Sequence, residues 1–169
     1  MRSAASSAIL IGFLLACPAS AMEPVIGGPC EGCENVFVGL PELLESRAWI
    51  THAEEPGEPL IIEGTVRSAD GTAAKDIIVY AYHTDAGGVY PPGTTAHGRL
   101  RAWVRTDASG QYRFDTIRPG AYPGRDVAQH VHMHIIEPGR VTYYIDSIVF
   151  VDDPLLTAER RQQARRSTQ

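Results

Sequence analysis

The segment L-R-A-W-V-R-T-D-A-S-G-Q-Y-R-F-D-T-I, at residues 100–117, decides the fold class. Two β-rich runs, residues 100–106 and 111–117, flank the turn residues D-A-S-G, and aromatic side chains alternate with polar ones in the second run. This alternation is typical of a strand with one buried face. We therefore expect a β-hairpin here, closed by Pro119-Gly120.

Four further β-rich runs surround this segment. They lie at residues 60–66, 77–83, 130–136 and 143–150. Asp70-Gly71 follows the first run as a hairpin-turn signal, and Glu137-Pro138-Gly139 separates the last two. No helical period connects the runs. Short strands at this spacing predict an all-β domain with the architecture of an antiparallel β-sandwich.

The composition limits both architecture and function. The chain has 169 residues, of which 44% are hydrophobic and 21% charged. These values suit one folded domain and exclude overall disorder. The formal net charge is −5, so a nucleic acid is not an expected partner.

The N-terminus has the features of a secretory signal peptide. A short basic start precedes an apolar run over residues 8–16 and the small-residue motif Ala19-Ser20-Ala21. We expect removal of residues 1–21 and export, either secreted or periplasmic. A second route stays open, because Leu14-Leu15-Ala16-Cys17 resembles a bacterial lipoprotein signal. Only in that case, with Cys17 lipidated, is contact with a membrane expected.

The rest of the chain divides into three segments. They are an N-terminal segment at 22–58, the β-sandwich at 59–154 and a basic tail at 155–169, expected to be a polar helix or a frayed end. In the first segment, an apolar stretch at 36–44 suits a short helix or strand. Cys30 and Cys33 lie in a loop-like context, and we expect them to have a structural role, as a short-loop disulfide, rather than a redox-catalytic one.

Three histidines stand at alternate positions in the run Q-H-V-H-M-H-I-I, which begins at Gln129. Residues i and i+2 share one face of a strand, so His130, His132 and His134 project the same way. Imidazole is a common metal ligand, and such a row favours metal binding. If the metal is zinc, His83 or His97 is a candidate for an additional ligand.

Tyr90 and Tyr122 lie in loops rich in glycine and proline, A-G-G-V-Y-P and P-G-A-Y-P. Together with the histidine row they resemble the intradiol ring-cleavage dioxygenases, and most closely the compact exported members. The resemblance covers residues 28–156 and includes G-G-P-C-E-G-C-E near the N-terminus and the segment beginning H-G-R-L-R-A-W-V at His97. The family's A-H-I-H segment falls on Gln129-His130-Val131-His132.

The resemblance implies a site, a cofactor and a reaction. The implied cofactor is non-haem ferric iron (Fe³⁺), and the implied ligands are Tyr90, Tyr122, His130 and His132, with a register using His132 and His134 left open. The implied reaction cleaves a catechol-type diol with O₂ to a muconate-type diacid, with Tyr122 as the phenolate that leaves iron and acts as base. Arg125 is the candidate for the charge-stabilising arginine, because Val127 occupies the family position.

Two alternatives share the same strands. One is a transthyretin-like sandwich that serves as a non-catalytic binding or spacer module, and the other is a zinc-binding variant of the fold. The strand pattern does not separate them from a dioxygenase, whereas the tyrosines and the histidine row favour the enzyme. The expected partners are the catechol-type substrate and O₂, and a homo-oligomer is left open.

Overall fold

A computed structural model describes residues 25–27 and 32–167 of the protein. The expected signal peptide, Cys17 and Cys30 lie outside the described residues. Cys33 is disulfide-bonded, which agrees with a structural role for this cysteine. Within the described ranges, no helix combines the length and the hydrophobicity needed to cross a bilayer.

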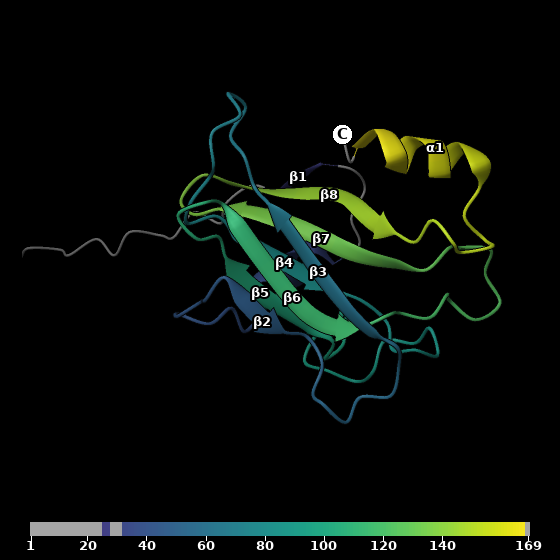
Figure 1. The fold of residues 1–169 in the computed structure, drawn as a ribbon. Coiled ribbons are helices and arrows are strands. Elements are labelled where there is room, and N and C mark those ends of the chain that lie inside the picture. Colours follow the sequence, from purple (N-terminus) through teal and green to yellow (C-terminus); the bar gives the residue numbers. More distant parts are fainter. Residues whose placement is uncertain (1–24, 28–31, 168–169) are drawn as a thin grey trace, which may run out of the picture.

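The chain forms two stacked β-sheets, which confirms the predicted sandwich (Figure 1). The five-stranded sheet has the order β1 (Val25–Gly27), β8 (Val141–Val149), β7 (His130–Glu137), β4 (Ile78–Tyr82) and β5 (Arg101–Arg105). The three-stranded sheet has the order β2 (Arg47–Trp49), β6 (Gln111–Ile117) and β3 (Pro59–Thr65). A 3₁₀ helix, η1 (Cys33–Phe37), precedes β2, and the helix α1 (Ala158–Ser167) forms the polar helix expected for the tail.

The connections differ from the predicted hairpins. β5 and β6 lie in different sheets, so the turn at 107–110 crosses between sheets and the hairpin prediction is wrong. Asp70-Gly71 likewise closes only a single bridge between Arg67 and Ala73. The alternation predicts which side chains face inward, but it does not specify which strand lies alongside. Two short pairs, β1 with β8 and β2 with β6, are parallel, and only β7 and β8 form the antiparallel hairpin that the turn between them suggests.

The space between the sheets is filled by alternate apolar side chains. Val79, Val104, Phe114 and Val131 are completely buried there. Burying each such side chain stabilises the fold by about 2 kcal/mol. This core anchors β7 from one side and thereby fixes which of its residues face away from the sandwich interior.

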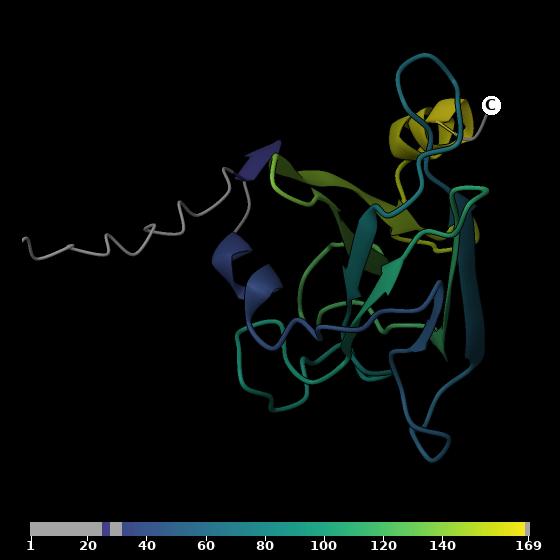
Figure 2. The same ribbon diagram turned by 90° about the vertical axis from the view of Figure 1, so that its left-hand side faces the viewer.

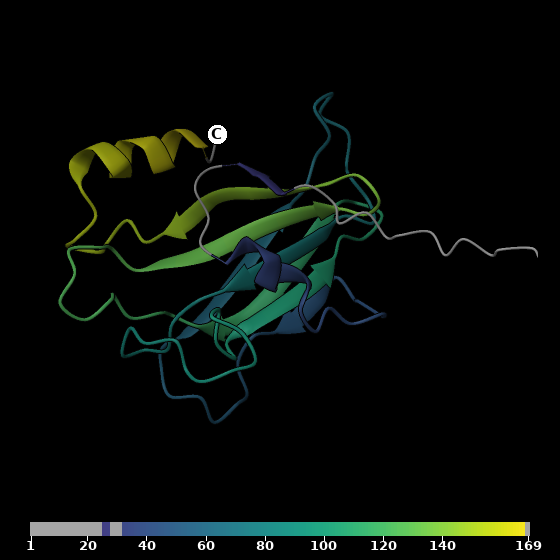
Figure 3. The same ribbon diagram turned by 180° about the vertical axis from the view of Figure 1, so that it is seen from behind.

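The outer face of the five-stranded sheet is covered as well. Val36 of η1 is buried against Ile78, Tyr80 and Ile136, and the Trp103 indole donates a hydrogen bond to the Val36 carbonyl over 2.8 Å. Figures 2 and 3 show η1 lying on this face, on the opposite side of the molecule from β3. The part of this face that η1 covers is therefore shielded from water.

Candidate functional site

The histidine row lies on β7, and its side chains alternate as predicted. Val131 and Met133 pack into the core between the sheets, so His130, His132 and His134 face the covered outer side. His130 and His132 are half-buried, whereas His134 is completely buried. The strand thus places three imidazoles on the partly covered outer face of the five-stranded sheet.

Two loops that contact each other closely carry the tyrosines. The backbone N–H of Gly120 donates to the Asp85 carbonyl over 2.8 Å, and the Asp85 carboxylate accepts from the N–H groups of Gly87 and Val89 at 2.9 and 3.0 Å. Gly88 has φ +80°, and a Cβ there would lie 1.8 Å from the Ala121 carbonyl oxygen. Only glycine permits this approach, and it sets the spacing between the two loops.

The four implied ligands converge on one point. The Tyr90 and Tyr122 hydroxyls are 2.8 Å apart, and the Tyr122 hydroxyl lies 3.2 Å from His130 Nε2 and 3.3 Å from His132 Nε2. The two Nε2 atoms are 3.1 Å apart. Residues from two loops and one strand therefore bring two oxygens and two nitrogens together.

Both histidines present Nε2 to this point. His130 Nδ1 donates to the Ala128 carbonyl over 2.7 Å, which leaves its Nε2 with a free lone pair. His132 stacks on Tyr82, with ring centroids 4.5 Å apart and 16° between the planes. Burial, and secondarily the neighbouring His130, lower the pKa of His132 to about 3. Its imidazole is therefore neutral near pH 7, as a metal ligand must be.

The phenols suit a highly charged cation. Burial, followed by the hydrogen bond with Tyr122, raises the pKa of the Tyr90 hydroxyl above its usual value, so without a cation it keeps its proton. A trivalent ion reverses this preference, because anionic oxygen is the ligand that hard cations favour. Among the described residues, no group of three or more His, Cys, Asp or Glu is placed to hold a metal. The donor set therefore depends on its tyrosines, and it fits ferric iron.

His134 does not join the cluster. Its ring packs near Tyr80 and Tyr144, with centroids 5.7 and 4.9 Å away. Neither of its ring nitrogens has a hydrogen-bond partner in the part of the chain that the structure describes. The structure thus brings His130 and His132 to the tyrosines, whereas His134 is not part of the cluster.

The two histidines considered as additional zinc ligands lie elsewhere, so that expectation is wrong. His83 points between the sheets, where its ring nitrogens lie 2.6 Å from the Thr84 carbonyl and 2.7 Å from Thr116 Oγ1. His97 stacks on Tyr82 at 3.8 Å, so the Tyr82 ring separates it from His132. The alternation along β4 explains the position of His83, because Tyr82 faces the site and the side chain that follows it faces the core.

Arg125 lies beside the cluster. It is exposed, and its Cζ is 5.9 Å from the centroid of the Tyr122 ring. Its backbone N–H donates to the Tyr122 carbonyl over 3.2 Å, so the turn that aims Tyr122 also carries the arginine. Val127 is partly exposed nearby in the chain.

Sequence reasoning missed two aromatic residues around His132. Tyr82 supplies the stacked ring, and Tyr144 places its hydroxyl 3.0 Å from His132 Nδ1. The position of Tyr82 was readable from the alternation in β4. Tyr144 was not, because its contact depends on the register between β7 and β8.

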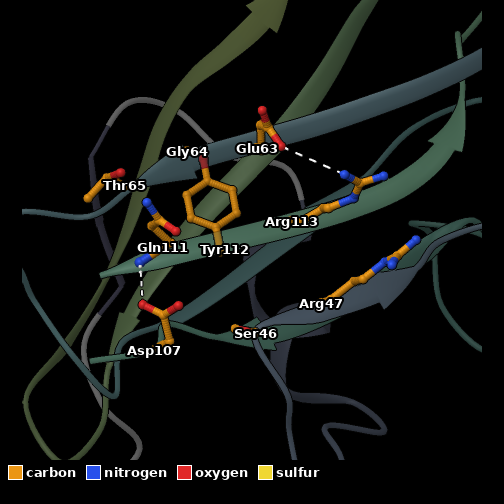
Figure 4. Close-up of a pocket in the computed structure, with 9 residues that line it drawn as sticks. All are labelled: Ser46, Arg47, Glu63, Gly64, Thr65, Asp107, Gln111, Tyr112 and Arg113. Carbon is orange, nitrogen blue, oxygen red and sulfur yellow. Dashed lines mark hydrogen bonds and ion pairs between the residues drawn. The ribbon is translucent and has the colours of Figure 1, made fainter. Parts of the chain in front are cut away.

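The structure also has a cavity of about 510 Å³ near the three-stranded sheet (Figure 4). It is lined by Ser46, Arg47, Glu63, Gly64, Thr65, Asp107, Gln111, Tyr112 and Arg113. None of the candidate ligands borders it. Both of its arginines are already paired with Asp115, so the cavity has no free cationic group.

Comparison with known proteins identifies the family to which the chain is similar. Residues 36–167 match the family model described as Dioxygenase (Dioxygenase_C). Catechol 1,2-dioxygenase 1 of Acinetobacter lwoffii is 31% identical over 137 residues, which cover 68% of this chain and 44% of that enzyme. The chain spans about half the length of the curated relatives it matches.

Solved structures share the fold. The dioxygenase domain of a dioxygenase–carbohydrate-binding protein fusion from Streptomyces sp. SirexAA-E is 26% identical, with a TM-score of 0.55 over 68% of this chain and 71% of that one. Catechol 1,2-dioxygenase from Pseudomonas arvilla C-1 is 24% identical, with a TM-score of 0.60 over 80% of this chain and 47% of that one. With the family match over most of the chain, these relatives show that the protein belongs to the intradiol ring-cleavage dioxygenase family.

Proposed function

We propose that the protein cleaves a catechol-type diol with O₂ between its two hydroxylated carbons, producing a muconate-type diacid. The observation that carries this proposal is the convergence of the Tyr90, Tyr122, His130 and His132 donor atoms, all linked by contacts of 2.8 to 3.3 Å. These residues would hold ferric iron, which supplies a Lewis acid that favours phenolate and catecholate oxygens. A spacer module has no need of such a cluster.

The two tyrosines have different surroundings and therefore different proposed roles. Tyr122 contacts the other three ligands and sits in a turn beside the exposed Arg125. We assign its phenolate oxygen the role of accepting a proton from a catechol hydroxyl. Tyr90 has its pKa raised chiefly by burial, and its loop is fixed by Gly88 and Asp85. We assign it the role of the ligand that stays in place.

Arg125 has the charge that the reaction requires. Loss of both hydroxyl protons makes the diol a dianion, and a cation beside Tyr122 stabilises that charge. The described residues show no ion pair to this guanidinium within 4 Å. The proposed setting is outside the cytoplasm, which rests on the signal-peptide pattern of residues 1–21.

Oxygen consumption by the purified, iron-loaded chain with a panel of catechols tests the activity. We expect a coloured protein, because ferric phenolates absorb visible light, and O₂ uptake with at least one catechol. Tyr90→Phe and His132→Ala should each abolish the colour and lower activity at least about a hundredfold, since loss of a ligand exceeds the effect of losing an outer partner.

Matched controls separate the site from the fold. Tyr112→Phe removes a hydroxyl at the other sheet and His52→Ala removes an exposed imidazole, and both variants should stay coloured and active. A wild-type protein that stays colourless after aerobic iron loading contradicts the proposal. A coloured protein with no O₂ uptake on any catechol indicates a metal-binding module instead.

A further inference from the structure

The hydroxyl of Tyr144 faces the ring nitrogen of His132 that points away from the cluster. The Tyr144 oxygen lies 3.0 Å from His132 Nδ1, while His132 Nε2 faces Tyr122 and His130. In the β7–β8 register, Tyr144 is paired with His134, so it reaches His132 diagonally along the ladder. Tyr144 is therefore in contact with a candidate ligand while lying outside the ligand set.

A β-bulge brings a second hydroxyl to the same place. The register shifts between Val131 and Met133, which pair with Ile148 and Ile145, so β8 has one extra residue opposite His132. The shift reverses the alternation of β8 after Tyr144 and turns Ser147 toward the same face. The Ser147 Oγ lies 3.4 Å from His132 Nδ1.

The two histidines have different kinds of orienting group. The Ala128 carbonyl beside His130 Nδ1 can only accept a hydrogen bond, which places the proton on that nitrogen. A tyrosine hydroxyl can donate or accept. A neutral histidine in water prefers to carry its proton on Nε2, the atom that must be free to bind a metal. His132 therefore needs a partner that accepts from Nδ1.

We propose that Tyr144 is the positioning residue of the metal site: its hydroxyl accepts the Nδ1 proton of His132 and keeps the Nε2 lone pair directed at Tyr122 and His130. This inference rests on the proposed role of His132 as an iron ligand. Accepting that proton also makes Nε2 a stronger donor. Ser147 is the weaker second acceptor, because its distance is longer.

Tyr144→Phe in the full chain tests this inference, with iron affinity and the visible phenolate band as readouts. Loss of an outer partner lowers metal affinity about 10- to 100-fold, measured by competition with a chelator. The band should move to longer wavelength, because a weaker imidazole donor leaves iron more electron-deficient. The double variant Tyr144→Phe/Ser147→Ala should show the larger effect on both readouts.

Tyr143→Phe is the matched control. It makes the same change one residue away on β8, where Tyr143 pairs with Ile135 and interacts with Glu137 on the other side of the sheet. Its iron affinity and band should equal those of the wild type. Thermal unfolding of all variants shows whether a loss of affinity comes from loss of the fold.

The outcomes separate this inference from the proposed activity. If the wild type is coloured and the double variant has the same affinity and band, the role of Tyr144 is overturned and the proposed function stands. If the wild type binds iron without consuming O₂ and Tyr144→Phe shifts the band, the activity is overturned and the role of Tyr144 is supported. A wild type that binds no ferric iron overturns both.

Discussion

The outer faces of the two sheets both carry polar side chains at alternate strand positions, yet they differ in nearly every physical respect. On the three-stranded sheet, Arg47 and Arg113 each form paired hydrogen bonds with the Asp115 carboxylate, at distances of 2.8 to 3.2 Å. Trp49 is 63% exposed beside them. This face is open to solvent, and its charges neutralise one another.

On the outer face of the five-stranded sheet, the polar groups are aromatic rings that are partly or completely buried. The Nε2 atoms of His130 and His132 face each other and the Tyr122 hydroxyl, and His134 has no hydrogen-bond partner among the described residues. Burial lowers the pKa of His132 and His134 and raises that of Tyr90, which favours the neutral form of these three groups. The comparison shows that the charged groups on the exposed face already satisfy one another. The neutral donor atoms on the buried face point at one another, and they are therefore available to bind a cation.

We expect the largest effect on the candidate site from a substitution that separates the two loops that carry Tyr90 and Tyr122. Gly88→Ala places a Cβ 1.8 Å from the Ala121 oxygen at φ +80°, and we expect a loss of about 3 kcal/mol or more of stability together with the iron colour. Gly71→Ala is the control, because φ is +86° and no atom lies within 4 Å of its Cβ. It should cost about 1 kcal/mol and leave the colour unchanged. Equal losses in thermal unfolding would contradict the clash.

The second test separates a structural histidine from a ligand. His83→Ala removes a buried ring that contacts Thr116 of the opposite sheet, and we expect a loss of about 2–3 kcal/mol in chemical denaturation with iron binding retained. His132→Ala should show the reverse pattern, a fold close to wild-type stability without iron. If His83→Ala bleaches the protein while it remains folded, His83 acts on the site and our division of the histidines is wrong.

The smallest effect concerns the three-stranded face and depends on pH. Arg113 and then Arg47 lower the pKa of Asp115 to about 2 from 3.8. The folded-state pKa is below the unfolded one, so the stabilisation is complete above pH 4 and is lost as the pH falls toward 2. Because both arginines are partly exposed, we expect Asp115→Asn to lower the free energy of unfolding at pH 7 by about 1 kcal/mol.

In acid-titrated denaturation curves, the difference between Asp115→Asn and the wild type should shrink between pH 4 and pH 2. Glu63→Gln is the control, since Glu63 is 71% exposed and 3.9 Å from Arg113, and its effect should be close to zero. A difference that stays constant over this pH range would show that the Asp115 charge is not what stabilises the face.

Much of this molecule follows from local patterns in the chain. β-rich composition between turn signals located the six long strands, and the period of two placed His130, His132 and His134 on one face because side chains of a strand project to alternate sides. Glycine and proline marked the loops that aim Tyr90 and Tyr122. The short strands at this spacing, with no helical period between them, were sufficient to predict a sandwich.

The tertiary structure decided what local patterns do not encode. Strands β5 and β6 are joined by a short turn but lie in different sheets, because pairing depends on packing across the whole core. The tyrosine loops reach His130 and His132 but not His134, which is completely buried beside Tyr80 and Tyr144. The contact between Tyr144 and His132 depends on the register between β7 and β8, and the approach of Ser147 depends on a bulge in β8 that has no sequence signal of its own. Each of these features is set by how the sheets and loops pack together, which no local pattern encodes.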